Sequence, residues 1–193
     1  MKDKKADVIK YIIENKNEEL NINAVSKGLK MDYKNVHAII QRLEKEALVD
    51  VQSFGKSSRV KLVSKVHPLI FEAEYNRKEE LLKDKNLAVM LSNFKKALKS
   101  KFYVLLVFGS YAAHTQTKKS DIDLMFIVPD GMEELFEKDV HRVARLLPLP
   151  IHYLVFSDKQ FLEMVYSREP NVGQEALKNN IILQGIENYY EMV

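Results

Sequence analysis

One stretch constrains this chain more than any other: an apolar run, a Gly-Ser pair, and a second apolar run that opens with two acids. The run 102–108 leads into Gly109 and Ser110, and ten residues then separate Ser110 from Asp121. Asp123 follows after one isoleucine, and the apolar segment continues to a proline. Short apolar runs bounded by turn residues are typical of buried strands. The stretch therefore predicts a strand, a Gly-Ser turn, a short helical turn or loop, and a second strand.

The two acids carry a specific chemistry if they lie on a strand. Side chains alternate between the two faces of a strand, so Asp121 and Asp123 are expected to share a face, with Cα atoms about 6.5 Å apart. Two carboxylates on one face repel each other unless a cation lies between them. Mg²⁺ prefers oxygen ligands and keeps waters and substrate phosphates among them. The acids therefore predict a Mg²⁺ site, and the alternative is a strand with two surface acids.

The Gly-Ser pair suits a phosphate. Gly109 has no Cβ, so the backbone can approach a bound group closely. Ser110 can open a helical turn whose free N–H groups favour phosphate. Ser120, directly before the first acid, is a further candidate for nucleotide binding. Together with the acids, these residues predict a site for a metal-bound nucleoside triphosphate, such as ATP.

This combination resembles the signature of the minimal nucleotidyltransferases in the DNA polymerase β-like superfamily. The resemblance rests on Gly109-Ser110, the ten-residue spacing and Asp121-x-Asp123, and it extends from about Leu87 to the C-terminus. It implies an α+β domain with a small mixed sheet flanked by helices. It also implies that the two acids bind Mg²⁺ and act in catalysis, transferring NMP from an NTP to an acceptor hydroxyl.

Two positions depart from the usual pattern of that family. Relatives usually add a third carboxylate from the strand beside the Asp-x-Asp strand, and the matching position here is His152. A neutral imidazole can act as a general base or ligand, so His152 is a candidate catalytic residue, but it supplies no negative charge for a second Mg²⁺. No acid occurs in this strand. Asp158 follows it but lies about 20 Å further along an extended chain, so we do not expect it to replace the third carboxylate. Ala113-His114 stands where relatives often carry Arg-Gly.

The first 66 residues form a different kind of unit. They contain 14 Lys/Arg and 9 Asp/Glu, a balance typical of a domain that faces a polyanion. The spacing of apolar residues predicts three helices, of which the second is capped by Asn21 and the third by Asp32. The third helix should bury Val36, Ile39, Ile40 and Leu43. Two alternating runs on either side of residues 54–58 predict a hairpin with a basic tip.

Three helices and a hairpin resemble a winged helix-turn-helix domain, in which the third helix enters the major groove and the wing contacts the DNA backbone. Double-stranded DNA is therefore an expected partner, and reading a two-fold site favours a homodimer. The alternatives are a plain solvated surface or a module for protein docking or dimerisation. The candidate DNA-binding residues are Lys34, Asn35, His37, Gln41 and Arg42 on the helix, and Lys56 and Arg59 in the wing.

A break at Val66-His67-Pro68 marks the expected domain boundary, because the residue before a proline avoids helix. We expect a winged-helix domain at 1–66, a connector helix at 67–85 that could also be a dimer contact, and a nucleotidyltransferase-like domain at 86–193. The chain has no cysteine, its start does not have the pattern of a signal peptide, and no run approaches the ~18 apolar residues of a membrane span. These features favour a cytoplasmic protein without a membrane partner.

Two functions of different classes fit these patterns. The first is a Mg²⁺-dependent nucleotidyltransferase tethered to a DNA-binding winged helix. The second is a transcription regulator whose nucleotidyltransferase domain is catalytically degenerate and serves as a nucleotide sensor or dimer scaffold. A protein-interaction module that uses neither site, such as one partner of a toxin–antitoxin pair, is a third possibility.

Overall fold

The computed structural model describes residues 4–54, 57–63 and 65–193. Contacts between Cα atoms divide the chain into two units, Met1–Asn76 and Arg77–Val193, and each unit has its own sheet. The predicted α+β class is confirmed. The division falls inside the helix α4 (Pro68–Leu81), in the region expected to be a connector.

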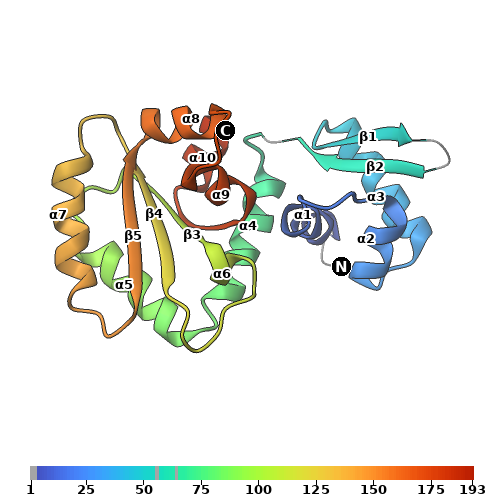
Figure 1. The fold of residues 1–193 in the computed structure, drawn as a ribbon. Coiled ribbons are helices and arrows are strands. Elements are labelled where there is room, and N and C mark those ends of the chain that lie inside the picture. Colours follow the sequence, from blue (N-terminus) through green and yellow to red (C-terminus); the bar gives the residue numbers. More distant parts are fainter. Residues whose placement is uncertain (1–3, 55–56, 64) are drawn as a thin grey trace. The chain divides into compact units, whose positions relative to one another are not determined.

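The N-terminal unit has the predicted winged helix-turn-helix arrangement (Figure 1). The strands β1 and β2 pair antiparallel, with Val49 opposite Leu62 and Gln52 opposite Arg59. The three helices contact one another and the hairpin. In chain order the elements are α1 (Lys4–Glu14), α2 (Ile22–Leu29), α3 (Tyr33–Lys45), β1 (Val49–Phe54) and β2 (Ser57–Leu62).

The starts of α2 and α3 follow from short polar residues. The Asn21 side chain accepts a hydrogen bond from the Ala24 N–H at 2.9 Å. The Asp32 carboxylate accepts from the N–H groups of the first turn of α3, at 2.9 and 3.3 Å. Both predicted caps are confirmed. The inner face of α3 buries three of the four expected residues, while Ile39 is only half-buried, so its assignment to the core was wrong.

We expect Asp32→Ala to lower the free energy of unfolding by about 1 kcal/mol, because alanine leaves two N–H groups at the start of α3 without their acceptor. Asp32→Asn keeps an acceptor oxygen in the same place and should cost only a few tenths of a kcal/mol, the difference between good N-cap residues. Denaturant unfolding monitored by circular dichroism measures both. Equal losses for the two variants would mean that the carboxylate stabilises the protein by its charge and not as a cap.

The C-terminal unit is built on a four-stranded mixed sheet with the order β5-β4-β3-β6. The central strand β3 pairs antiparallel with β4 and β6, and β4 pairs parallel with β5. The mixed sheet was predicted, but β6 was not. Phe102 was expected in the first strand, but it lies before β3 and is 77% exposed. The strands are β3 (Val104–Phe108), β4 (Ile122–Val128), β5 (Ile151–Ser157) and β6 (Asn180–Gln184).

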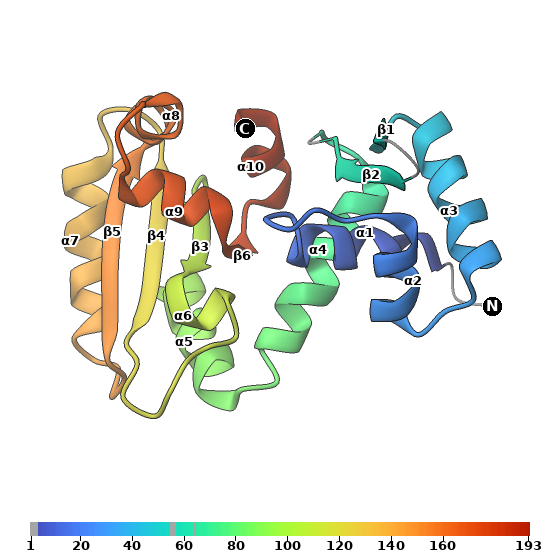
Figure 2. The same ribbon diagram turned by 45° about the vertical axis from the view of Figure 1, so that its right-hand side comes forward.

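Helices cover both faces of this sheet. On one face, α5 (Lys85–Ala97) and α7 (Glu133–Ala144) pack in a cluster that includes Phe94, Phe126 and Phe136. The opposite face is covered by helices that follow β5, and Figure 2 shows α9 crossing in front of β4 and β3. These helices bury Phe161 and Tyr189. They are α8 (Asp158–Tyr166), α9 (Val172–Lys178) and α10 (Ile186–Met192).

A buried polar network stands at the start of β6. Arg77, from the end of α4, is 6% exposed and donates from Nη2 to the carbonyl oxygen of Asn180 at 2.7 Å. The Asn180 amide in turn donates to the Ala176 carbonyl and to the Tyr189 hydroxyl. Asn180 also pairs with Phe108, the last residue of β3.

Among the helices of the described residues, none has the length and apolar character that a membrane crossing needs.

Candidate functional site

Three neighbouring strands bring the predicted site residues of the C-terminal unit to one level of the sheet. Phe108, at the end of β3, pairs with Asp123 of β4. Asp123 in turn pairs with His152 of β5. Gly109 follows Phe108 directly. The Gly-Ser turn, Asp123 and His152 therefore lie side by side across β3, β4 and β5. The strand pairing that this arrangement needs could not be obtained from sequence spacing alone.

Gly109 lies directly against the carboxylate of Asp123. Its φ is +63°, and a Cβ built on it would stand 2.5 Å from Asp123 Oδ2. Both facts require glycine, because other residues rarely adopt this backbone conformation and the space is already filled. The chain then makes one helical turn, α6 (Gly109–Ala112), with Ser110 half-buried at its start. The predicted turn after β3 is therefore confirmed, together with a contact that the sequence did not indicate.

Asp123 and His152 are hydrogen-bond partners. His152 Nδ1 lies 3.2 Å from Asp123 Oδ1, and the two side chains are 59% and 28% exposed, respectively. A carboxylate can only accept, so a neutral ring in this contact carries its proton on Nδ1 and leaves the lone pair of Nε2 available. The two oxygens of Asp123 thus have different neighbours, His152 at Oδ1 and Gly109 at Oδ2.

Asp121 is exposed and lies just before β4. The N–H of Ile122 donates to the carbonyl oxygen of Pro150 at 2.8 Å, which holds this end of β4 beside the start of β5. Strand alternation places Asp121 on the face of Asp123, and the proximity of their carboxylates stays a prediction.

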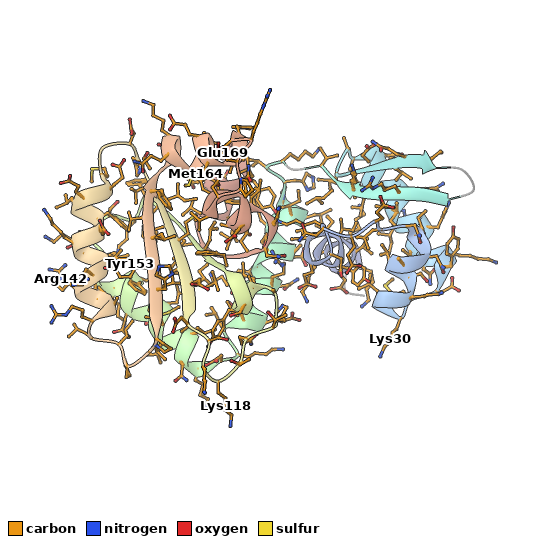
Figure 3. All side chains as sticks on the ribbon, viewed as in Figure 1. Lys30, Lys118, Arg142, Tyr153, Met164 and Glu169 are labelled. Atoms are coloured by element: carbon orange, nitrogen blue, oxygen red, sulfur yellow. The ribbon has the colours of Figure 1, made fainter. Side chains whose placement is uncertain are left out.

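The loop between α6 and β4 is tied by its own side chains. The Ser120 hydroxyl accepts from the Thr117 N–H at 2.9 Å, and the Ser120 N–H donates to the Thr117 carbonyl at 3.1 Å. His114 has a φ of +55°, a left-handed conformation that glycine adopts more readily. Lys118 points away from the sheet at the tip of this loop (Figure 3). The loop therefore holds Ser120 and Asp121 in place while exposing a basic tip.

The carboxylates present fit one Mg²⁺ better than two. A single Mg²⁺ is commonly held by one or two carboxylates, with waters and substrate phosphates as its other ligands, and Asp121 and Asp123 can provide that. Within the described ranges, no group of three or more His, Cys, Asp or Glu residues is placed to hold an ion. Asp158 does not complete the set. It lines a cavity of about 310 Å³ with Val128 and Met192, at the far end of β4.

Tyr153 belongs to the opposite face of β5. Its hydroxyl lies 2.8 Å from His141 Nδ1 on α7. Burial raises the pKa of the Tyr153 phenol, and the carboxylate of Glu137 raises it further. His141 is exposed. The pair does not join the cluster of Gly109, Asp123 and His152.

Most candidate DNA-binding residues of α3 lie on its outer face. Lys34, Asn35, Gln41 and Arg42 are exposed, and His37 is half-buried with its ring centroid 6.0 Å from that of Tyr33. In the wing, Lys56 lies outside the described residues. Arg59 is half-buried, and its Nη2 lies 3.3 Å from Glu19 Oε1. The helix therefore presents a polar surface, while the described wing arginine has an intramolecular partner that the sequence did not indicate.

The comparisons with known proteins concern the two parts of the chain differently. Residues 91–181 match the family model described as Nucleotidyltransferase domain, a range that contains every candidate residue of the C-terminal site. Among solved structures, the chain is similar to MepR, a transcription regulator of the Staphylococcus aureus multidrug efflux pump MepA, and to a complex of S. aureus MepR with DNA. The first match has 16% identity and a TM-score of 0.34, over 49% of this chain and 75% of that chain. The second has 16% identity and a TM-score of 0.35, over 50% and 76%. No curated protein gives a significant match.

Proposed function

We propose that this protein transfers a nucleoside monophosphate from ATP or another nucleoside triphosphate to an acceptor hydroxyl. The match of residues 91–181 to the nucleotidyltransferase family model supports the proposal. The observation that carries the proposal is the junction of Gly109, Asp123 and His152. There, the turn approaches one oxygen of the carboxylate and the imidazole approaches the other. A bare backbone turn beside a partly exposed acid suits a polyphosphate that arrives with a divalent cation.

The reaction requires a base for the acceptor. The acceptor oxygen forms a bond to the α-phosphorus as the bond from that phosphorus to pyrophosphate breaks, and the hydroxyl proton must leave. We assign His152 as the group that takes the proton on Nε2, since its Nδ1 is directed at Asp123. A carboxylate beside Nδ1 fixes the tautomer and stabilises the imidazolium that forms.

The remaining site residues bind and orient the triphosphate. Asp121 and Asp123 would hold one Mg²⁺, which would supply positive charge to the phosphates. Gly109 and Ser110 would position the β- and γ-phosphates, and Ser120 would be a further contact for the nucleotide. The proposal places the reaction in the cytoplasm, where nucleoside triphosphates and DNA are both present.

Label transfer tests the proposal directly. The purified protein, given Mg²⁺ and ATP labelled at the α-phosphate, should label itself or a component of a cleared lysate, and EDTA should stop the labelling. ATP labelled at the γ-phosphate is the matched control and should give no label, because that phosphate leaves with pyrophosphate. Repeating the assay with each nucleoside triphosphate identifies the preferred base. Label from the γ-position alone would indicate a kinase reaction and contradict the proposal.

A second candidate function is favoured by the absence of a carboxylate at position 152. With no acid on β5, the site has two carboxylates where two-metal transfer needs more negative charge. In this case the protein binds ATP and Mg²⁺ without turnover, and the C-terminal unit senses nucleotide or supports a dimer for a transcription regulator. Saturable ATP binding without α-label transfer would select this candidate.

The same proposal gives the N-terminal unit double-stranded DNA as its partner, with a homodimer reading a two-fold site. The outer face of α3 supports it, since Lys34 and Arg42 are exposed cations and Asn35 and Gln41 are exposed amides. Amide side chains at such positions can pair with adenine in the major groove, while cations contact phosphate.

We expect Lys34→Ala to weaken DNA binding uniformly across sequences and to reduce the slope of log affinity against log salt concentration by about one unit, as for the loss of one phosphate contact. Gln41→Ala should relax sequence preference at one base pair, by about 1–3 kcal/mol. Fluorescence anisotropy with double-stranded oligonucleotides measures both effects. Lys99→Ala is the control, because it removes the same charge at an exposed position of the C-terminal unit. Unchanged affinity and slope for Lys34→Ala would show that α3 does not face DNA.

A further inference from the structure

The wing of the N-terminal unit contains an arginine that is bound by an acid of the same unit. Arg59 lies on β2, opposite Gln52 of β1. Its Nη2 is 3.3 Å from Glu19 Oε1, and the two side chains are 40% and 81% exposed. Glu19 belongs to the segment between α1 and α2, which is far from the wing in sequence.

The backbone fixes this pairing. The N–H of Val60, the residue after Arg59, donates to the carbonyl oxygen of Leu20, the residue after Glu19, at 2.8 Å. Val60 and Leu20 are both buried. The two charged residues therefore face each other because their neighbours are joined, and the contact is not a chance meeting of two long side chains.

Part of the Arg59 guanidinium is buried within the N-terminal unit. Arg59 Nε is buried and has no hydrogen-bond partner among the described residues, while the other side of the guanidinium faces Glu19. A guanidinium binds carboxylates and phosphates through the same planar set of N–H donors. A DNA phosphate beside the wing would therefore compete with Glu19 for the same guanidinium.

We infer that Glu19 takes, at Arg59, the place of a DNA phosphate, and that it thereby sets the affinity of the winged helix for DNA. In the free protein the Glu19 carboxylate pairs with the Arg59 guanidinium. A DNA phosphate must displace this carboxylate before it can bind Arg59. An exposed ion pair is weak, so the exchange is possible at physiological salt. The inference rests on the proposed DNA-binding function, and it adds an internal competitor that reduces non-specific binding.

The prediction is that Glu19→Gln raises the affinity of the full-length protein for DNA by roughly two- to fivefold, the range that an exposed pair represents. Glu18→Gln is the matched control: Glu18 is the adjacent residue, is also exposed, and makes no ion pair with Arg59 among the described contacts. It removes the same charge and should change affinity by much less. The probe is a double-stranded oligonucleotide of mixed sequence, followed by fluorescence anisotropy at two salt concentrations.

Combining Glu19→Gln with Arg59→Gln tests whether Glu19 acts on DNA binding through Arg59. If Glu19 acts through Arg59, the gain from Glu19→Gln disappears in the Arg59→Gln background, whereas Arg59→Gln alone weakens binding. A gain that persists in that background, or equals that of Glu18→Gln, would show a simple effect of net charge and overturn the inference. If the wild-type protein binds DNA and Lys34→Ala weakens that binding, but Glu19→Gln leaves the affinity unchanged, only this inference is refuted. If the wild-type protein binds no DNA, the DNA-binding proposal is refuted as well. Melting temperatures of all variants exclude loss of folding as the cause.

Discussion

Gly109→Ala should abolish nucleotide transfer and weaken the binding of a non-hydrolysable ATP analogue by at least about tenfold, the equivalent of 1.4 kcal/mol. Two costs add. Alanine at a φ of +63° is strained, which costs about 1–3 kcal/mol. The new methyl group would also stand 2.5 Å from Asp123 Oδ2, so the carboxylate must move and its contact with His152 is disturbed. Isothermal titration calorimetry with Mg²⁺ and the analogue measures the binding.

Gly131→Ala separates these two costs. Gly131, in the turn after β4, has a φ of +82°, and a Cβ there meets nothing within 4 Å. Its replacement introduces backbone strain without a clash, so it should lower the melting temperature slightly and leave transfer and ATP binding intact. If Gly109→Ala also retains normal binding and transfer, the turn does not serve the nucleotide, and the assignment of Gly109 to the site is wrong.

Asp123→Asn should reduce the rate of nucleotide transfer by about 10²–10³-fold, because the carboxylate charge that organises the metal and its phosphates is worth several kcal/mol. Asparagine has the same size and keeps an oxygen that can accept from His152 Nδ1, so the fold should be unaffected. Asp121→Asn should act in the same direction. Initial rates with α-labelled ATP, together with melting curves, measure activity and folding separately.

Asp130→Asn is the matched control for the acids. Asp130 is an exposed acid of the turn after β4, with its carboxylate 3.8 Å from Lys159, and it has no role in the proposed site. Its replacement should leave the rate within about twofold, as expected for a surface ion pair. Transfer at the wild-type rate by Asp123→Asn would remove the main support for the enzyme and leave nucleotide sensing as the better candidate.

Much of the fold was predictable because local chemistry decides it. Short polar side chains that cap helices lie directly before the apolar residues of those helices, and Asn21 and Asp32 were recognised for this reason. The strands β4 and β5 appeared as apolar runs ending near turn residues.

What could not be predicted depends on residues far apart in the chain. The strand β6 is five residues long and is defined by pairing with β3, which no local pattern indicates. The buried hydrogen bond from Arg77 to Asn180 spans 103 positions. The contacts of Gly109 with Asp123 and of Glu19 with Arg59 likewise require the strand register, or a backbone bond between distant segments. The sequence therefore indicated the chemical types in the site but not which atoms meet.

The order of the strands also bears on how such a site could change during evolution. The turn and both acids come from one continuous hairpin, β3 to β4, in the middle of the sheet, while position 152 lies on the outermost strand with a largely solvent-exposed side chain. A new residue at 152 therefore disturbs little packing, whereas one at 109 collides with its neighbour. Descendants of such a scaffold can lose, retune or recover catalysis by single substitutions on that outer strand, without losing the ability to fold.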